Sequence, residues 1–309
     1  MGDNLFPGAQ SEIAAVRSLL LKHPRDAWLS QDSVSSQWRP LNYASEPDFG
    51  RALAEYDAFV ELLRRTGPEI RFLPADPRTG LDSLYVRDAA VATSRGLILG
   101  RMGKELRRGE PDAVRDYCAR AGLPVLGVIE APGTLEGGDV VWLDEQTLLA
   151  GRGYRTNAEG IRQLRRLSAG LVNELVEVPL PHWRGPADVL HLMSLLSPVA
   201  PGTLLVYPPL LPVPFLDWLR ARDVRLLEVP GEEFESLGVN VLALAPGACL
   251  ALAGNPRTRK TLEAAGIEVL VYEGREISFK GAGGPTCLTR PLIRGEAAAV
   301  RSQPATAGR

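Results

Sequence analysis

Short apolar runs that follow a polar residue recur along the chain at a nearly constant interval. They are rich in Val, Leu and Ile and are bounded by Gly, Pro or Asp, which is typical of strands and hairpins. The polar residues that precede them are Asp88, Glu136, His191, Asn240 and Cys287. Successive members of this series lie 48, 55, 49 and 47 residues apart. The pattern therefore predicts five similar strand-rich units.

Helical patterns lie before and between these units. They predict helices over residues 50–66, 110–121, 157–168, 215–222 and 257–265. Asn157 is a suitable N-cap for the third of these helices, since Glu159 falls in its first turn. We expect a strand over residues 70–73 to begin the first unit, and a strand within LDSLYVRD, between Asp82 and Asp88.

Five units that cannot bury their apolar faces alone would close into a ring, with one polar residue of each unit at the centre. A doubly wound sheet is the alternative. We expect a single domain over residues 1–309. Residues 1–10 and 294–309 are rich in small and polar residues, and they are expected to be loose tails.

Composition narrows the classes of protein and partner. Hydrophobic residues make up 45% of the chain, enough for a packed core. The 35 Lys and Arg residues nearly balance the 37 Asp and Glu residues, so nucleic acid and anionic membranes are disfavoured as partners. The N-terminus does not resemble a signal peptide and no run of about 20 apolar residues occurs. We therefore expect a cytoplasmic protein.

Cys287 is the strongest candidate for a nucleophile. It follows the glycine-rich segment KGAGGPT, which would let backbone approach a ligand closely. A cysteine of this kind reacts as the thiolate, and it needs a nearby base or cation. The alternative is a buried structural cysteine, and this is what we expect of Cys118 and Cys249.

His191 is the best partner for Cys287 among the three histidines, because it shares the phase of the repeat whereas His23 and His182 adjoin prolines. Glu136 lies in GTLEGGD, where paired glycines would leave its carboxylate uncrowded. Without the repeat, His191 would be taken as structural and Glu136 as a turn residue.

Carboxylates and arginines provide candidate substrate ligands. Asp82 and Asp88 suit the binding of a planar guanidinium group. Arg107, Arg108 and Arg155 could bind a substrate carboxylate. Neither a metal-binding pattern nor a nucleotide-binding motif is present, so the sequence requires no metal and no cofactor.

These segments resemble the guanidine-modifying, or pentein, superfamily, and within it the dimethylarginine dimethylaminohydrolases (dimethylargininases). The similar segments include LDSLYVRDAAVATSRG, GTLEGGDVVWL, GRGYRTNAEGIRQL, HLMSLL and GGPTCLTRPL, in the order of the family. The resemblance implies an α/β fold built as a five-fold pseudo-symmetric αβ propeller. It also implies hydrolysis of a guanidinium C–N bond of arginine or methylarginine, with citrulline as product.

By the same resemblance, Cys287 would be the nucleophile, His191 the general acid and base, and Glu136 the carboxylate that orients His191. Asp82 and Asp88 would then bind the substrate guanidinium. Two arginines, Arg107 of LRRGE and Arg155 of GYRTN, would bind the substrate carboxylate. Penteins are often dimers, so a homodimer is also expected by analogy.

Two positions depart from the dimethylargininase pattern: Arg87 stands where Glu is usual, and Met193 where a basic residue is usual. Arginine deiminase and amidinotransferase activities therefore stay open, as does a ligand-binding protein without catalysis. The family's lid over the active site is expected within residues 27–45.

Overall fold

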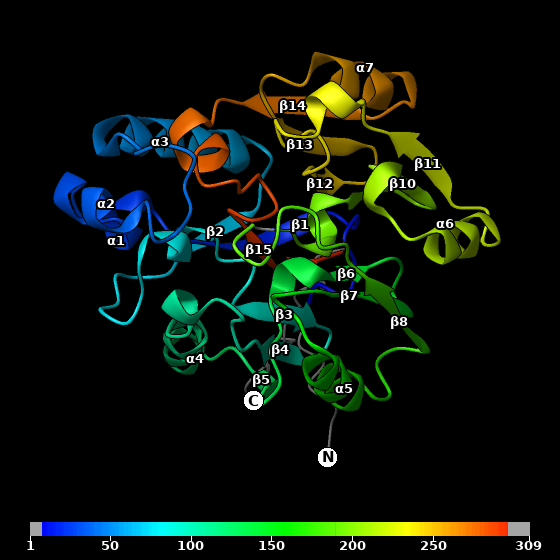
Figure 1. Ribbon diagram of the computed structural model, residues 1–309, viewed down its shortest axis with the longest axis horizontal. Coiled ribbons are helices and arrows are strands. Elements are labelled where there is room, and N and C mark those ends of the chain that lie inside the picture. Colours follow the sequence, from blue (N-terminus) through cyan, green and yellow to red (C-terminus); the bar gives the residue numbers. More distant parts are fainter. Residues whose placement is uncertain (1–7, 189, 296–309) are drawn as a thin grey trace, which may run out of the picture.

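The computed structural model describes residues 8–188 and 190–295. Fifteen strands in this part of the chain form five separate three-stranded sheets, with helices packed on the outer side (Figure 1). In each sheet the middle strand pairs antiparallel with one neighbour and parallel with the other. The prediction of an α/β protein with five strand-rich units is confirmed at this level.

The strands, in the order in which they pair within each sheet, have the following bounds. They are β15 (Arg290–Arg294), β1 (Val16–Leu21) and β2 (Glu69–Phe72); β3 (Ala90–Thr93), β4 (Gly96–Leu99) and β5 (Val125–Val128); β6 (Val140–Trp142), β7 (Thr147–Arg152) and β8 (Glu174–Pro179); β9 (Leu196–Ala200), β10 (Thr203–Val206) and β11 (Arg225–Glu228); and β12 (Leu242–Ala245), β13 (Ala248–Leu252) and β14 (Glu268–Tyr272).

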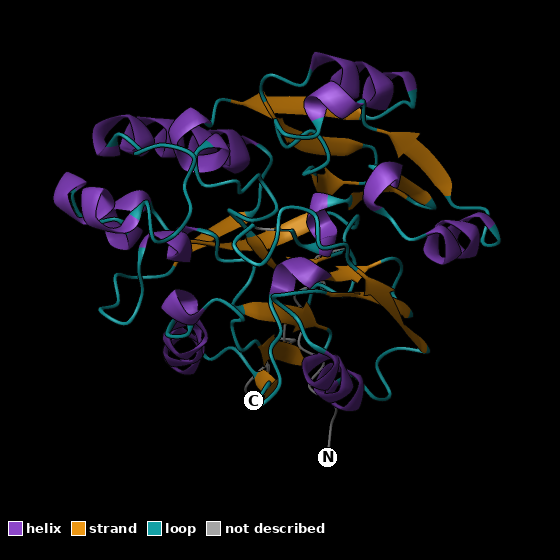
Figure 2. Cartoon of the chain, viewed as in Figure 1, coloured by secondary structure: helices purple, strands orange, loops and turns teal. Residues whose placement is uncertain are grey.

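A helix joins the two parallel strands of each sheet, because a parallel pair needs a long crossover connection. These helices lie at the periphery of the molecule in Figure 2. They are α3 (Phe49–Arg65), α4 (Glu110–Ala121), α5 (Ala158–Leu167), α6 (Val213–Arg220) and α7 (Pro256–Ala264). Asn157 caps α5 as predicted, since its side chain accepts a hydrogen bond from the Gly160 N–H. The remaining helices are α1 (Pro24–Ala27) and α2 (Gln31–Gln37).

Short helical turns complete the secondary structure. They are the 3₁₀ turns η1 (Leu81–Leu84), η2 (Glu105–Arg107), η3 (Gly137–Asp139), η4 (Leu192–Ser194), η5 (Pro208–Leu210) and η6 (Gly231–Glu233), and the π-helical turn η7 (Arg275–Phe279).

Two local predictions are wrong. The strand near residues 70–73 is β2, which pairs with β1 beside β15 and so completes the fifth sheet instead of beginning the first. LDSLYVRD holds the turn η1 instead of a strand. Its backbone is bound by side chains from elsewhere: Trp28 Nε1 donates to the Leu81 carbonyl, and Arg107 Nη2 donates to the carbonyls of Asp82 and Tyr85. These side-chain donors bind carbonyl groups that a neighbouring strand would bind if the segment were part of a sheet.

The predicted tails differ from the structure where they can be compared. Ala9 is buried, and Gln10 Nε2 donates to the carbonyls of Glu145 and Leu171. Arg294 is buried at the end of β15. The rest of both predicted tails lies outside the described residues.

Apolar residues from the sheets and the inner faces of the helices form the core. Cys118 and Cys249 are buried in it with free thiols, as predicted. Among the described helices, none has both the length and the apolar character needed to cross a membrane.

Arg87 belongs to a cluster of buried charged side chains that also contains Glu12, Arg290 and Arg294. Its guanidinium donates to Glu12 at 2.5 Å, and both side chains are almost fully buried. Arg290 and Arg294 are also buried. Burial alone would raise the pKa of Glu12, but the charge of Arg87 and its hydrogen bond keep that pKa below its usual range, and the charges of Arg294 and Arg290 act in the same direction as Arg87. Glu12 is therefore the acidic residue that offsets the charge of this cluster.

Replacing Glu12 by Gln should lower the free energy of unfolding by about 3 kcal/mol or more, because it leaves Arg87 charged, buried and unpaired. Urea denaturation of wild type and variant measures the difference. The control is Glu235→Gln, which breaks a surface pair with Arg184 and should cost less than about 1 kcal/mol. Equal effects of the two substitutions would contradict this account of the cluster.

Candidate active site

The five polar residues of the repeat stand just before the first strand of each sheet. Asp88 precedes β3, Glu136 precedes η3 and β6, and His191 precedes η4 and β9. Asn240 precedes β12 and Cys287 precedes β15. Direct contacts join His191 to Asp88 and Glu136, and Asn240 to Cys287. The Arg87 N–H donates to the Cys287 carbonyl, which ties the cysteine loop to the segment that carries Asp88.

His191 and Glu136 form a buried pair, with 2.7 Å between Nε2 and Oε2. The other carboxylate oxygen of Glu136 accepts from the backbone N–H groups of Gly103 and Lys104. Gly138 is essential to this packing: a Cβ atom at this position would lie 2.6 Å from His191 Nδ1 and 2.8 Å from Asp88 Oδ1. The second glycine of LEGGD thus lets the histidine approach the two carboxylates.

The carboxylates around His191 favour its imidazolium form. Burial alone would lower the His191 pKa, but the charges of Asp88, Asp139 and Glu136 outweigh burial and raise it to about 9. Burial would raise the pKa of Glu136, but its hydrogen bond to His191 and the charge of His191 lower it to about 2. At neutral pH the pair is therefore an ion pair.

Cys287 lies in a partly exposed position at the end of its loop. Asn240 Nδ2 lies 3.5 Å from Sγ, while Asn240 Oδ1 accepts from the N–H and hydroxyl of Thr286. Gly284 makes room for this amide, because a Cβ atom there would lie 2.4 Å from Asn240 Oδ1. Burial and the Asp88 carboxylate raise the pKa of Cys287 to about 11, so the resting thiol is neutral.

The two predicted guanidinium ligands are both buried, and both already contact cations of the protein. Lys104 Nζ donates to Asp82 Oδ2 at 2.8 Å, and Arg107 Nη1 donates to Asp88 Oδ2 at 2.7 Å. Arg107 also binds both oxygens of Glu110 at 2.8 Å. A cationic substrate that reaches these aspartates would either share them with Lys104 and Arg107 or replace those two cations.

The two arginines predicted to bind the substrate carboxylate differ in the partners that they already have. Arg107 is buried among Asp88 and Glu110, so binding of a substrate carboxylate would require it to exchange partners. Arg155 Nη1 lies 3.9 Å from Glu136 Oε1, and Arg155 Nε is buried without a hydrogen-bond partner in the described part of the chain. The role of both arginines stays a prediction. Arg108, the third candidate, pairs with Glu105 at the surface.

Sequence reasoning missed three residues at the site. Asn240 was marked by the period of the repeat, but an amide suggested no chemistry. The fold brings Lys104 to Asp82, whereas Glu110 binds Arg107 from three residues further along the chain, within LRRGE. The repeat could have identified Asn240 and the short spacing in LRRGE could have identified Glu110; no comparable signal existed for Lys104.

Asp88, Glu136 and His191 could also be considered as metal ligands, since each offers an atom within 4.8 Å of the others. A metal ion bound there would have to displace the His191 proton, because the imidazolium form that the carboxylates favour has no lone pair for a metal. The arrangement fits proton transfer better than metal binding.

The segment after α2 lies over Asp82, within the region predicted to hold a lid. The Leu41 carbonyl accepts from Lys104 Nζ at 2.7 Å, and Ala44 N–H donates to the Lys280 carbonyl. Asn42 Nδ2 donates to the Ala187 carbonyl, in the loop before His191. Lys104 therefore links this segment to Asp82.

Comparison with known proteins identifies the family of the chain. Residues 39–294 match the sequence model of the family described as N,N dimethylarginine dimethylhydrolase, eukaryotic. The chain belongs to the dimethylarginine dimethylaminohydrolase family. Two bacterial relatives carry the name N(G),N(G)-dimethylarginine dimethylaminohydrolase. The Streptomyces coelicolor protein is 37% identical over 78% of this chain and 86% of its own length. The Pseudomonas aeruginosa protein is 30% identical over 80% of this chain and 91% of its own length.

The fold of the chain is also similar to that of solved structures, including one from the dimethylarginine dimethylaminohydrolase family. A cysteine-to-serine mutant of the Pseudomonas aeruginosa enzyme, complexed with citrulline, superimposes with a TM-score of 0.72 and 28% identity over 91% of this chain and 99% of that one. An amidinotransferase from Microseira wollei has a TM-score of 0.76 at 19% identity, covering 94% of this chain and 98% of that one. At this identity it shows a shared fold alone.

The two departures from the dimethylarginine dimethylaminohydrolase pattern both point away from Cys287. Arg87 is bound to Glu12 in the charge cluster behind the site. Met193 is buried and packs in the apolar core between the second and third units of the repeat. Neither side chain is among the contacts of Asp82, Asp88 or Cys287 within the described residues.

Alkylation of Cys287 by iodoacetamide should rise about tenfold per pH unit from pH 7 to pH 9, since the thiolate reacts and the pKa of Cys287 is about 11. Peptide-resolved mass spectrometry separates Cys287 from Cys118 and Cys249. A plateau reached below pH 8 would show a thiolate already formed at rest and would contradict the neutral-thiol state.

Proposed function

We propose that this chain hydrolyses a guanidinium C–N bond of a methylated arginine, giving citrulline and an amine, with Cys287 as nucleophile. Membership of the dimethylarginine dimethylaminohydrolase family confirms the prediction of a hydrolase that acts on guanidino C–N bonds. The observation that best supports the mechanism is the buried set of His191, Glu136 and Asp88, of which Asp88 lies near enough to Cys287 to raise the pKa of its thiol. The assignment of each residue's role is part of the proposal.

Substrate binding would begin with an exchange of cations. Asp82 and Asp88 would release Lys104 and Arg107 and accept the N–H groups of the substrate guanidinium, whose planar shape fits paired carboxylates. Arg155, with its unpartnered Nε, would bind the substrate carboxylate. A cation placed beside Cys287 stabilises its thiolate, so the arriving substrate would itself promote transfer of the thiol proton to water, and the sulfur would regain a proton when it is displaced from the product.

The chemistry would then proceed in two steps. The Cys287 thiolate forms a bond to the guanidinium carbon, and the C–N bond to the amine breaks as the His191 imidazolium gives that nitrogen a proton. His191, now neutral, takes a proton from water, whose oxygen attacks the same carbon and displaces the sulfur. Glu136 stabilises the imidazolium at both ends of the cycle. The products are citrulline and the amine.

Arginine deiminase activity is the second candidate. An arginine deiminase from Listeria welshimeri is 28% identical over 69% of this chain and 62% of its own length. Arg87 and Met193, which separate the chain from the usual dimethylargininase pattern, do not contact the two aspartates, so they do not decide between the substrates. Transfer of the amidino group to an amine, and ligand binding without catalysis, are the remaining alternatives.

We also propose that the five sheets form a five-bladed αβ propeller within one catalytic domain. Contacts between β9 and β12, and between β3 and β15, support an arrangement in which the first strands of the sheets adjoin. The homodimer and the cytoplasmic location stay predictions.

The direct test is citrulline formation from arginine, monomethylarginine and asymmetric dimethylarginine. Wild type should turn over the methylated substrates, and Cys287→Ser should lose at least about 10³-fold in kcat because its hydroxyl is a far weaker nucleophile. Cys118→Ala, which removes a core thiol remote from the site, should keep most of the activity.

Turnover of arginine alone would indicate that the chain is an arginine deiminase. Product that forms only when glycine or ornithine is added would indicate amidino transfer. A folded wild type that binds all three guanidines but converts none would contradict an enzymatic role.

A further inference from the structure

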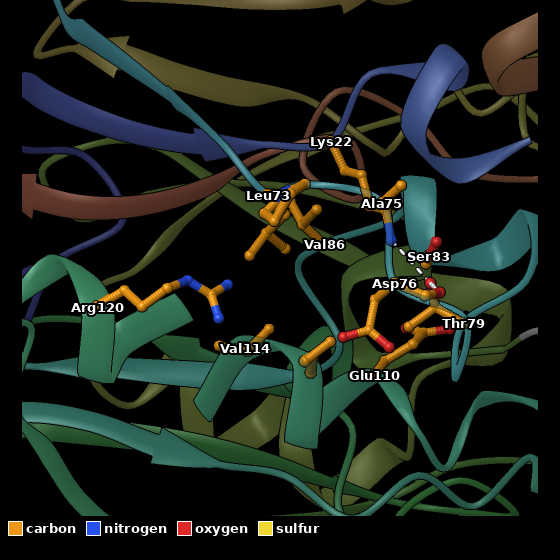
Figure 3. A pocket seen from close by; sticks show the side chains of 13 residues that line it. Lys22, Leu73, Ala75, Asp76, Thr79, Ser83, Val86, Glu110, Val114 and Arg120 are labelled. Carbon is orange, nitrogen blue, oxygen red and sulfur yellow. Dashed lines mark hydrogen bonds between the residues drawn. The ribbon is translucent and has the colours of Figure 1, made fainter. Parts of the chain in front are cut away.

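A cavity separate from Cys287 lies between α4 and the ends of β1 and β2. It encloses about 540 Å³ of empty space, part of it open to solvent. Figure 3 shows the side chains that line it. The apolar part of its wall consists of Leu73, Pro74, Ala75, Val86, Ala89, Ala113 and Val114, and the polar part of Lys22, Asp76, Thr79, Ser83, Glu110 and Arg120.

The basic and acidic side chains of this cavity differ in their direct partners. Asp76 is bound by Arg78 at 2.6 Å, and both oxygens of Glu110 are bound by Arg107. Both acidic side chains of the wall therefore have an arginine partner outside it, although Arg78 also binds Asp116 and Arg107 also binds Asp88. Lys22 and Arg120 have no carboxylate within salt-bridge distance among residues 8–188 and 190–295.

Lys22 is the more unusual of these two cations. It is 1% exposed, and its one direct side-chain hydrogen bond in the described structure goes from Nζ to the Thr79 hydroxyl at 2.8 Å. Burial lowers its pKa although the charges of Glu110, Asp76 and Asp26 act in the opposite direction. An ammonium group has three donors, and a buried charge without a counterion is costly, so an anion at Nζ would be stabilising.

Arg120 supplies a second cation from the last turn of α4. It is exposed at the surface end of the cavity, and it makes no hydrogen bond or ion pair in the described structure. In Figure 3 its guanidinium points towards the other labelled side chains, with Val114 and Val86 between it and the Lys22 end. The two cations thus lie on opposite sides of the apolar part of the wall, with Asp76 and Glu110 on the side of Lys22.

We propose that this cavity is a second binding site, which takes a short aliphatic dicarboxylate. One carboxylate would bind Lys22 Nζ, and the other would bind Arg120. The carbon chain between them would contact Leu73, Val86 and Val114. A single carboxylate would leave one of the two cations unpaired, and a cationic ligand would meet both.

The site would also lie next to the catalytic network. Glu110 lines the cavity with its side chain and holds Arg107, which binds Asp88 at 2.7 Å. Two ion pairs therefore separate the proposed ligand from the aspartate beside His191.

Isothermal titration of the full chain with glutarate tests the proposal without any need for turnover, so it does not depend on the proposed function. Glutarate should bind to wild type, glutaramide should not, and pentanoate should bind more weakly than glutarate. Lys22→Met should weaken glutarate binding by about 10-fold or more, because a hydrogen-bonded buried charge is lost. Arg120→Ala should weaken it by about 2- to 5-fold, because Arg120 is exposed.

Two control variants locate the binding. Arg115→Ala removes another exposed arginine of α4, one that pairs with Asp112, and should leave glutarate affinity unchanged. Arg155→Ala should also leave it unchanged, since Arg155 lies at the active site. Absence of glutarate binding to wild type would overturn the proposal, and so would binding that is lost with Arg155→Ala but kept with Lys22→Met.

Discussion

The buried ion pair between His191 and Glu136 is the interaction on which the rest of the site depends. Its two members precede strands of different sheets, yet their charged atoms lie 2.7 Å apart, and both side chains are almost fully buried. A buried pair of this kind is stable only if its remaining hydrogen-bonding groups are satisfied. Gly103 and Lys104 donate to Glu136, and Gly138 brings Asp88 near His191. The hydrogen bonds that stabilise this pair therefore hold three polar residues of the repeat close together: Asp88, Glu136 and His191.

The same network determines the resting state of the nucleophile. Burial, together with Asp88, which also helps to keep His191 protonated, disfavours a negative charge on Cys287, so the positive histidine and the neutral thiol coexist at neutral pH. A site of this kind is matched to a cationic substrate. In the proposed mechanism, the substrate guanidinium supplies the missing positive charge beside the sulfur and replaces the protein's own cations at Asp82 and Asp88. Recognition and activation are thus two results of one electrostatic arrangement.

The sequence predicted more of the site than of the surroundings that support it. The period of the polar residues located Asp88, Glu136, His191 and Cys287 because each begins an equivalent strand, and it located Asn240 without revealing its contact with the thiol. It could not show that Arg107 is bound by Glu110 and Asp88, because such pairing depends on how side chains pack within the folded first unit. The exchange of Glu for Arg at position 87 was likewise uninterpretable until Glu12, 75 residues away, was seen to pair with it. Local pattern predicts where units begin, but the partners of buried charges are set by the complete fold.

Mass spectrometry of the enzyme quenched in acid during turnover of asymmetric dimethylarginine is the most direct test of this account. We expect a fraction of the chain to carry an added mass equal to the substrate minus dimethylamine, located on the peptide that contains Cys287 and absent from Cys287→Ser. Full citrulline production with Cys287 unmodified at every quench time, and with turnover retained in Cys287→Ser, would contradict covalent catalysis by this thiol.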